Sequence, residues 1–102
     1  MNLKGDIIVK EFSNVRKIVV ACSSGLVSSA MGAKLLGDIL QSETIVVTNA
    51  AINRLSDDFD MLVVQTEYRP AIEMLDIKVP VIYVNNYLDR AAYESIKRKI
   101  ND

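Results

Sequence analysis

Short, continuous apolar runs rich in valine and isoleucine constrain the fold of this chain most strongly. Each run is too short for an exposed helix, and its lack of alternation with polar residues predicts a strand that is buried on both faces. Strands of this kind are typical of parallel sheets that helices cover on both sides. The four predicted strands are residues 18–21, 45–47, 61–64 and 81–84.

Amphipathic segments lie between the predicted strands and indicate helices. Ser28 and Asp89 suit the N-cap position of two of them, and Pro70 suits the first turn of another. The predicted helices are residues 29–40, a segment after Tyr68 that carries Ile72, Met74 and Leu75, residues 91–100, and a short helix at 50–55 after the second strand.

Strands and helices alternate along the chain, which predicts a parallel sheet with right-handed crossovers. The predicted fold class is therefore α/β, with a small, open, four-stranded parallel sheet of flavodoxin-like order 2-1-3-4 and helices on both faces. A length of 102 residues fits one domain. We assign residues 15–102 to this domain and residues 1–14 to an N-terminal leader or linker.

The chain contains one cysteine and no histidine. An internal disulfide, the usual zinc ligand sets and a Ser-His-Asp or Cys-His catalytic arrangement are therefore excluded for this chain on its own. We expect no metal and no cofactor. Any nucleophile must act without a histidine partner from the same chain.

The charged residues are balanced, with 12 Lys and Arg against 13 Asp and Glu. This balance argues against a nucleic-acid partner, because a phosphate backbone requires clustered positive charge. Apolar stretches are too short for membrane insertion, and the N-terminus lacks the apolar core of a signal peptide. We therefore predict a cytoplasmic protein with a reduced thiol.

Cys22 directly follows the first predicted strand and precedes the first helix. Backbone N–H groups of such a loop and helix start bind oxyanions, and the same field favours thiolate over thiol. Cys22 is thus the predicted nucleophile for a phosphoryl group, with a buried structural thiol as the alternative. The predicted phosphate-binding residues are Ser23, Ser24, Gly25, Leu26, Val27, Ser28 and Ser29.

Other polar residues are expected at the same edge of the sheet. Thr48 and Asn49 follow the second predicted strand, and Asn86 and Asp89 follow the fourth. We interpret these four as turn and cap residues, which need no catalytic role. Arg69 is predicted to be a solvated side chain rather than a phosphate ligand.

Partner proteins that exchange a phosphoryl group with Cys22 would require an exposed apolar rim beside it. Leu26 and Val27 are expected to form this rim, because they lie in a predicted loop. Met31 is predicted to pack into the core along the first helix.

Two known families have related loops. The pattern Cys-x-x-Gly-x-x-x-Ser from Cys22 to Ser29 resembles low-molecular-weight tyrosine phosphatases, although Ser28 occupies the position of their loop arginine. A closer resemblance is to the mannitol-type IIB domains of the bacterial sugar phosphotransferase system (PTS). It covers residues 15–22 with 28–33, residues 47–53 and residues 86–89, in order and at matching spacing.

The second resemblance implies a phosphoryl relay. Cys22 would accept a phosphoryl group from phosphohistidine of a IIA domain and pass it to a sugar or sugar alcohol bound by a membrane IIC domain. The chain has Ser23 and Val27 where the family usually has aspartate and a second glycine. A phosphatase-like hydrolase and a degenerate IIB-like regulatory module therefore remain the alternatives.

Overall fold

The structure is a computed structural model that describes residues 14–24 and 27–101. Of the predicted leader or linker, only Asn14 falls within these residues. The strands are β1 (Lys17–Cys22), β2 (Val46–Ala51), β3 (Met61–Gln65) and β4 (Val81–Val84), and the helices are α2 (Val27–Leu40), α3 (Arg69–Glu73) and α4 (Arg90–Asn101). Short 3-10 helices, η1 (Ile52–Arg54) and η2 (Thr66–Tyr68), follow β2 and β3.

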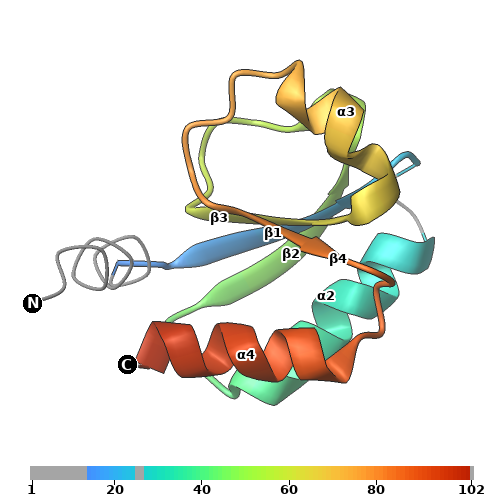
Figure 1. The fold of residues 1–102 in the computed structure, drawn as a ribbon. Coiled ribbons are helices and arrows are strands. Elements are labelled where there is room, and N and C mark those ends of the chain that lie inside the picture. The colour runs from blue at the N-terminus through green and yellow to red at the C-terminus, as the bar shows by residue number, and fades with distance from the viewer. Residues whose placement is uncertain (1–13, 25–26, 102) are drawn as a thin grey trace, which may run out of the picture.

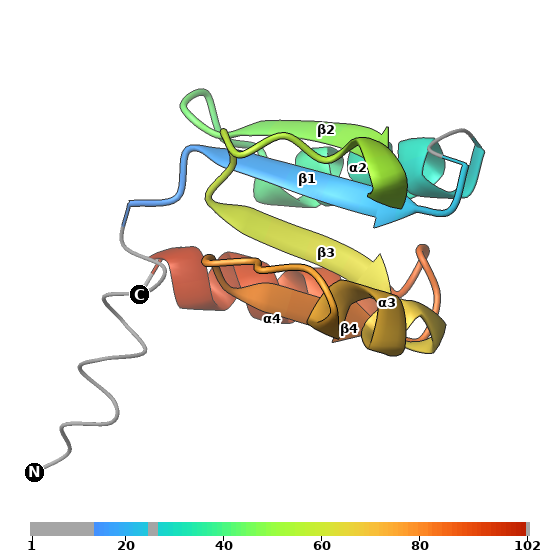
Figure 2. The same ribbon diagram turned by 90° about the horizontal axis from the view of Figure 1, so that it is seen from above.

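The strands form one parallel sheet in the order β2-β1-β3-β4, as predicted. β1 is central, and its pairing with β2 runs from Lys17↔Val46 to Cys22↔Ala51. Figure 2 shows that β1, β2 and β3 point the same way and that α2 begins beside the arrowhead of β1. The chain extends from β1 to β2 on one side and to β3 on the other, so the end of β1 lies at a topological switch point.

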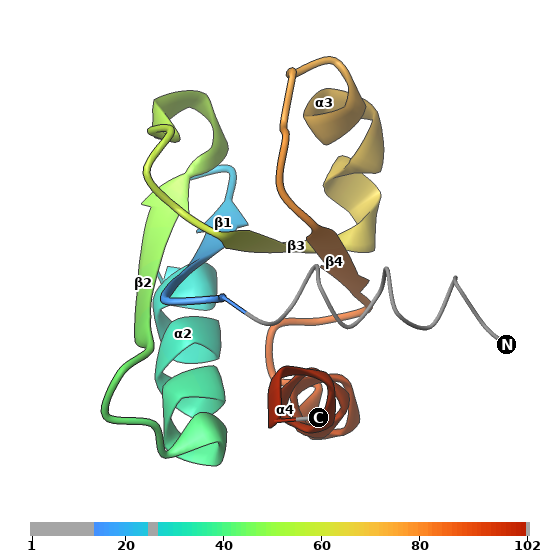
Figure 3. The same cartoon turned by 90° about the vertical axis from the view of Figure 1, so that its left-hand side faces the viewer.

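Helices cover both faces of the sheet, which confirms the predicted α/β class. α2 and α4 lie side by side on one face, and α3 lies on the other (Figures 1 and 3). The face beneath α2 and α4 buries the larger apolar cluster, which includes Ile18, Val20 and Cys22 of β1. The smaller cluster, under α3, includes Val19 and Ala21. Successive residues of β1 therefore point to opposite layers, as the pleat of a strand requires.

Burial on both faces holds for the central strands β1 and β3 but not for the edge strands. β2 and β4 are largely half-buried, and Val46 is exposed. The prediction of four fully buried strands was wrong for these two, because an edge strand has a neighbour on one side only and the helices do not extend fully over it.

β2 is also longer than predicted. Thr48 and Asn49 are strand residues rather than turn residues, and Ala50 and Ala51 end the strand instead of starting a helix. Only the short η1 follows. The physical reason is the continuous pairing with β1, which supplies partners for the β2 backbone as far as Ala51 and overrides the local preference.

Helix boundaries differ in part from the predictions. α2 begins at Val27, so Ser28 lies in the first turn and is not the N-cap. α3 ends at Glu73 with only Ile72 buried, although Pro70 stands in its first turn as predicted. Asp89 does cap α4, because its Oδ1 accepts a hydrogen bond of 3.1 Å from the N–H of Ala92.

Gly32 of α2 lies against two tyrosines at the contact with α4. A Cβ at this position would lie 3.0 Å from the carbonyl oxygen of Tyr87 and 3.0 Å from the hydroxyl of Tyr93. Those two oxygens are themselves joined by a 2.6 Å hydrogen bond from the Tyr93 hydroxyl. Moving either oxygen away from Gly32 would break this buried hydrogen bond. The absence of a side chain at Gly32 therefore allows α2 to lie close to the loop after β4.

The two glycines of α2 should therefore respond oppositely to the same substitution. Gly32→Ala should lower the free energy of unfolding by about 1–3 kcal/mol, because overpacking forces the backbone to shift. Gly37→Ala should raise it by about 0.5–1 kcal/mol, because alanine favours the helix and the nearest atom to its Cβ is 4.0 Å away. Urea unfolding followed by circular dichroism measures both, and shifts of the same sign would contradict this packing.

Candidate functional site

Cys22 is the last residue of β1 and lies at the carboxyl edge of the sheet. Its exposure is only 4%, and its side chain belongs to the apolar cluster beneath α2 and α4. The predicted nucleophile is thus a core residue whose sulfur faces the beginning of a helix.

The sulfur of Cys22 contacts the first turn of α2. Its Sγ donates a hydrogen bond of 3.1 Å to Oγ of Ser29, which is fully buried. The hydroxyl of Ser24 lies 3.9 Å from the same sulfur. The first N–H groups of a helix have no partner within it and carry a partial positive charge, so this end of α2 favours an anion at the sulfur.

Asn49 joins this contact from the neighbouring strand. Its side-chain Nδ2 donates a hydrogen bond of 3.4 Å to the Ser29 hydroxyl. The sequence interpretation missed this residue as part of the site, because it placed Asn49 in a turn. A longer second strand would have revealed it, since Asn49 then shares a face with Val47, which packs against the cluster that contains Cys22.

The other predicted phosphate-binding residues follow Cys22 in the sequence. Ser23 and Ser24 are exposed after β1, and Val27 and Ser28 are exposed in the first turn of α2. Gly25 and Leu26 lie outside the described residues. Val27 is a helical residue rather than a loop residue. Among the described residues, Gln41 is the only non-glycine with a positive φ, so Val27 needs no glycine-like backbone.

Tyr87 fastens the end of β1 next to Cys22. Its buried hydroxyl donates to the carbonyl oxygen of Ala21 and accepts a 3.2 Å hydrogen bond from the N–H of Gln65 at the end of β3. Burial raises the pKa of Tyr87 to about 12. The phenol is therefore neutral at physiological pH and acts as a clamp between two strands. Sequence reasoning did not identify it.

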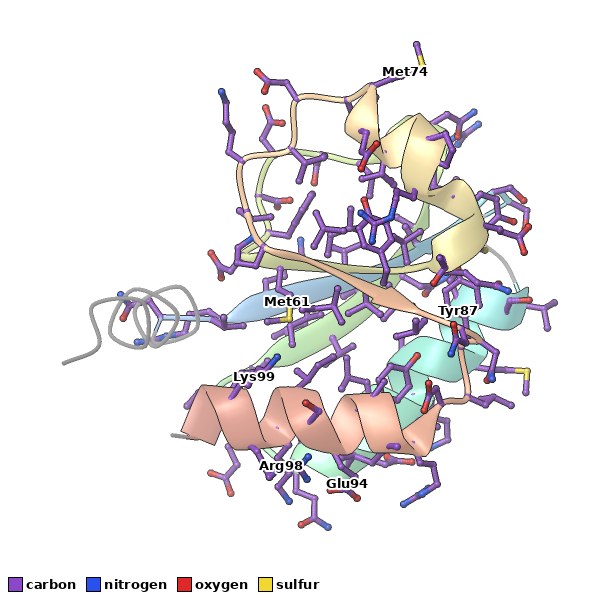
Figure 4. The ribbon with its side chains drawn as sticks, in the orientation of Figure 1. Met61, Met74, Tyr87, Glu94, Arg98 and Lys99 are labelled. Carbon is purple, nitrogen blue, oxygen red and sulfur yellow. The ribbon has the colours of Figure 1, made fainter. Side chains whose placement is uncertain are left out.

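A cavity of about 240 Å³ opens beside this clamp. It is lined by Ser28, Met31, Gln65, Asn86, Tyr87 and Leu88. Figure 4 shows Tyr87 where the loop after β4 passes the beginning of α2. A larger hollow of about 420 Å³ lies between the segments that precede β3 and β4, at the opposite edge of the sheet, so it is not the place of the cysteine chemistry.

Exposed apolar side chains form a rim here: Met31 and Leu88 line the cavity, and Val27 begins the helix that carries Met31. Val27 is 70% exposed, Met31 50% and Leu88 49%. The prediction that Met31 packs into the core was wrong, because this residue falls on the outer side of α2, whose buried face carries Ala33 and Leu36 instead.

The remaining polar candidates have structural contacts. Arg69 stacks on the ring of Tyr83 at 4.0 Å and pairs with Glu73 at 3.4 Å. Asn86 accepts a 2.8 Å hydrogen bond from the N–H of Leu88, as a turn residue does. The contact of Asn86 agrees with its predicted role in a turn, whereas Arg69 was predicted to be solvated and also contacts Tyr83 and Glu73.

Within the part of the chain that the structure describes, no group of three or more histidine, cysteine or acidic side chains is arranged to hold a metal ion. No helix there has the length and apolar character needed to cross a membrane.

Comparison with known proteins identifies relatives over most of the chain. It is 38% identical over 99 residues to the PTS system mannitol-specific EIICBA component of Escherichia coli (strain K12) and 37% identical over 99 residues to that of Klebsiella pneumoniae. These matches cover 91% of this chain and 15% of each relative. A mannitol-specific EIICB component of Geobacillus stearothermophilus is 36% identical over 86 residues, which is 82% of this chain and 18% of that protein.

The chain thus spans less than a fifth of the length of these curated relatives. A protein-family model described as the PTS system, lactose/cellobiose-specific IIB subunit, matches residues 17–99, from the start of β1 into the last turn of α4. The family description and the names of the relatives refer to different sugars but agree on the PTS. Because the family match covers the whole sheet and its helices, the chain belongs to the PTS IIB family.

Proposed function

We propose that this chain is a phosphoryl carrier of a sugar phosphotransferase system and that Cys22 carries the phosphoryl group. The observation that supports this most directly is the position of the Cys22 sulfur, at the end of a central parallel strand and against the first turn of α2. An anion is favoured there by the free N–H groups and dipole of the helix. Membership of the IIB family supports the same chemistry.

The proposed reaction has two transfers. In the first, the Cys22 thiolate attacks phosphorus, the S–P bond forms, and the N–P bond to a histidine of a IIA domain breaks. In the second, a sugar hydroxyl attacks phosphorus, the O–P bond forms, and the S–P bond breaks. The hydroxyl proton passes to a base of the IIC domain or to water, and Cys22 leaves as thiolate. Neither transfer needs a histidine on this chain, which has none. This corresponds to a protein-N(π)-phosphohistidine–sugar phosphotransferase component.

The proposed cradle for the transferred group is the segment between β1 and α2. Ser23, Ser24 and Ser28 are exposed there and have hydroxyls that can donate to phosphate oxygens. Gly25 and Leu26 complete the predicted segment, and Val27 contributes a backbone N–H from the helix start.

The proposed acceptor is a sugar alcohol of the mannitol class, held by a membrane IIC domain. This rests on relatives in three genera, all named as mannitol-specific components. Their EIICBA and EIICB names also support IIC and IIA domains as the kind of partner.

A phosphatase-like hydrolase is supported less well. A phosphatase of this type stabilises the transferring phosphoryl group with a guanidinium fork. Ser28 occupies that sequence position, and Arg69 at the same edge is engaged with Tyr83 and Glu73.

Labelling of the protein with phosphate tests the proposed role of Cys22. Incubation with phosphoenolpyruvate, the general PTS enzymes and the IIA part of the E. coli mannitol relative should place an acid-stable, iodine-labile phosphate on the wild type. Cys22→Ser should abolish the label, because the hydroxyl of serine is not ionised at neutral pH and cannot replace a thiolate. Radiolabel retained after gel electrophoresis measures this.

The outcomes separate the three functions. Equal labelling of wild type and Cys22→Ser would reject Cys22 as the carrier. Cys22-dependent hydrolysis of p-nitrophenyl phosphate without labelling would favour a phosphatase. Absence of both activities from a folded protein would favour a regulatory IIB-like module.

We expect the IIA domain to dock on the rim of Val27, Met31 and Leu88. Met31→Glu should raise the concentration of IIA needed for half-maximal labelling by about tenfold, because a charge would have to be desolvated in the contact. The matched control is Met74→Glu. Met74 is 88% exposed and lies at the outer end of α3, away from Tyr87 (Figure 4).

Both methionine variants should fold as the wild type does, since both side chains are exposed. Equal effects of Met31→Glu and Met74→Glu on labelling by IIA would argue against this rim as the docking surface.

A further inference from the structure

Hydrogen bonds join Cys22, Ser29 and Asn49 into a small polar network inside the core. Ser29 is the only buried residue among the serines, threonines, amides and charged residues that the structure describes. Its hydroxyl accepts from the Cys22 thiol at 3.1 Å and from the Asn49 amide at 3.4 Å. The three residues come from α2, β1 and β2, so the network forms only in the folded protein.

The donors and acceptors in this hydrogen-bond network change when Cys22 loses its proton. A hydroxyl has one proton and two acceptor positions. In the thiol state, Cys22 and Asn49 fill both acceptor positions of the Ser29 oxygen. In the thiolate state, the sulfur has no proton and can only accept. The Ser29 hydroxyl must then turn its own proton toward the sulfur to keep the contact.

Asn49 favours that second arrangement. Its Nδ2 group has only protons to offer, so it cannot accept the hydroxyl proton of Ser29. It continues to occupy one acceptor position of the oxygen while the proton points to the sulfur. A hydrogen bond to an ionised acceptor is stronger than one between neutral groups, so the arrangement stabilises the thiolate.

We propose that Asn49 is a positioning residue that acts through Ser29 to direct a hydroxyl proton onto the Cys22 sulfur when the thiolate forms. The proposal rests on the proposed function in that it takes Cys22 to be the nucleophile. It also separates Ser29 from the rest of the predicted cradle. Ser29 is fully buried against the sulfur, whereas Ser23, Ser24 and Ser28 are exposed and remain the hydroxyls available to phosphate.

The test uses the rate of Cys22 alkylation by iodoacetamide as a function of pH. Cys22 is the only cysteine of the chain, so alkylation reports this one thiol and requires no partner protein. We expect the wild-type thiol to react well below pH 8.5, the ordinary value for cysteine. Ser29→Ala should slow alkylation at pH 7 by roughly three- to tenfold and move the profile to higher pH.

A double-mutant cycle decides whether Asn49 acts through Ser29. Asn49→Ala alone should slow alkylation at pH 7 by roughly two- to fivefold and shift the profile in the same direction. In the Ser29→Ala background, the same change should have no further effect. The neighbouring substitution Thr48→Ala, on the other face of β2, is the matched control and should leave the profile unchanged.

Other results would overturn the proposal. An Asn49→Ala profile identical to that of the wild type would show that the amide does not position the hydroxyl. An equal shift with and without Ser29 would show that Asn49 acts by another route. Should Ser29→Ala fail to fold, Ser29→Gly replaces it in the cycle, because it removes the same hydroxyl without adding a charge.

The same variants keep this proposal distinct from the carrier function. Coupling between Asn49 and Ser29 in a protein that is never labelled on Cys22 would retain the positioning role and reject the carrier. Labelling of Cys22 without coupling would reject the positioning role alone.

Discussion

The pairing of β1 with a strand on each side is the constraint on which the rest of the structure depends. Its ladder with β2 continues to Cys22↔Ala51, and its ladder with β3 continues to Ala21↔Val64. Because parallel strands end at one edge, this pairing delivers the cysteine to the switch point of the sheet. It also extends β2 far enough to bring Asn49 beneath the first turn of α2.

Cys22 combines two properties that usually exclude each other. It is buried in the apolar cluster under α2 and α4, yet its sulfur faces the positive end of α2 and a hydroxyl. Burial by itself opposes ionisation, because it removes the water that stabilises charge. In the proposed function, the polar contact with Ser29 and the helix N-terminus offset that penalty, so the proposed reactivity depends on tertiary contacts as much as on the cysteine.

The carboxyl edge of the sheet is also held by aromatic hydroxyls. Tyr87 joins the ends of β1 and β3, and Tyr93 in turn holds the backbone of Tyr87. Gly32 is required because the carbonyl of Tyr87 and the hydroxyl of Tyr93 occupy the space beside its Cα. The loop after β4 therefore serves as a support for the site, and its exposed Leu88 adds to the apolar rim at the same place.

The sequence by itself determined the parallel α/β class and the position of Cys22 between a strand and a helix, and the strand order was expected only by analogy with flavodoxin-like folds. Hydrophobic runs, turn residues and the lone cysteine are local signals, and a local pattern is sufficient for them. Only the tertiary structure decided the full length of β2, the exposure of Met31 and the meeting of Ser29 with Asn49. These depend on backbone pairing and helix rotation between segments far apart in the chain, and such contacts leave no periodic signal within either segment.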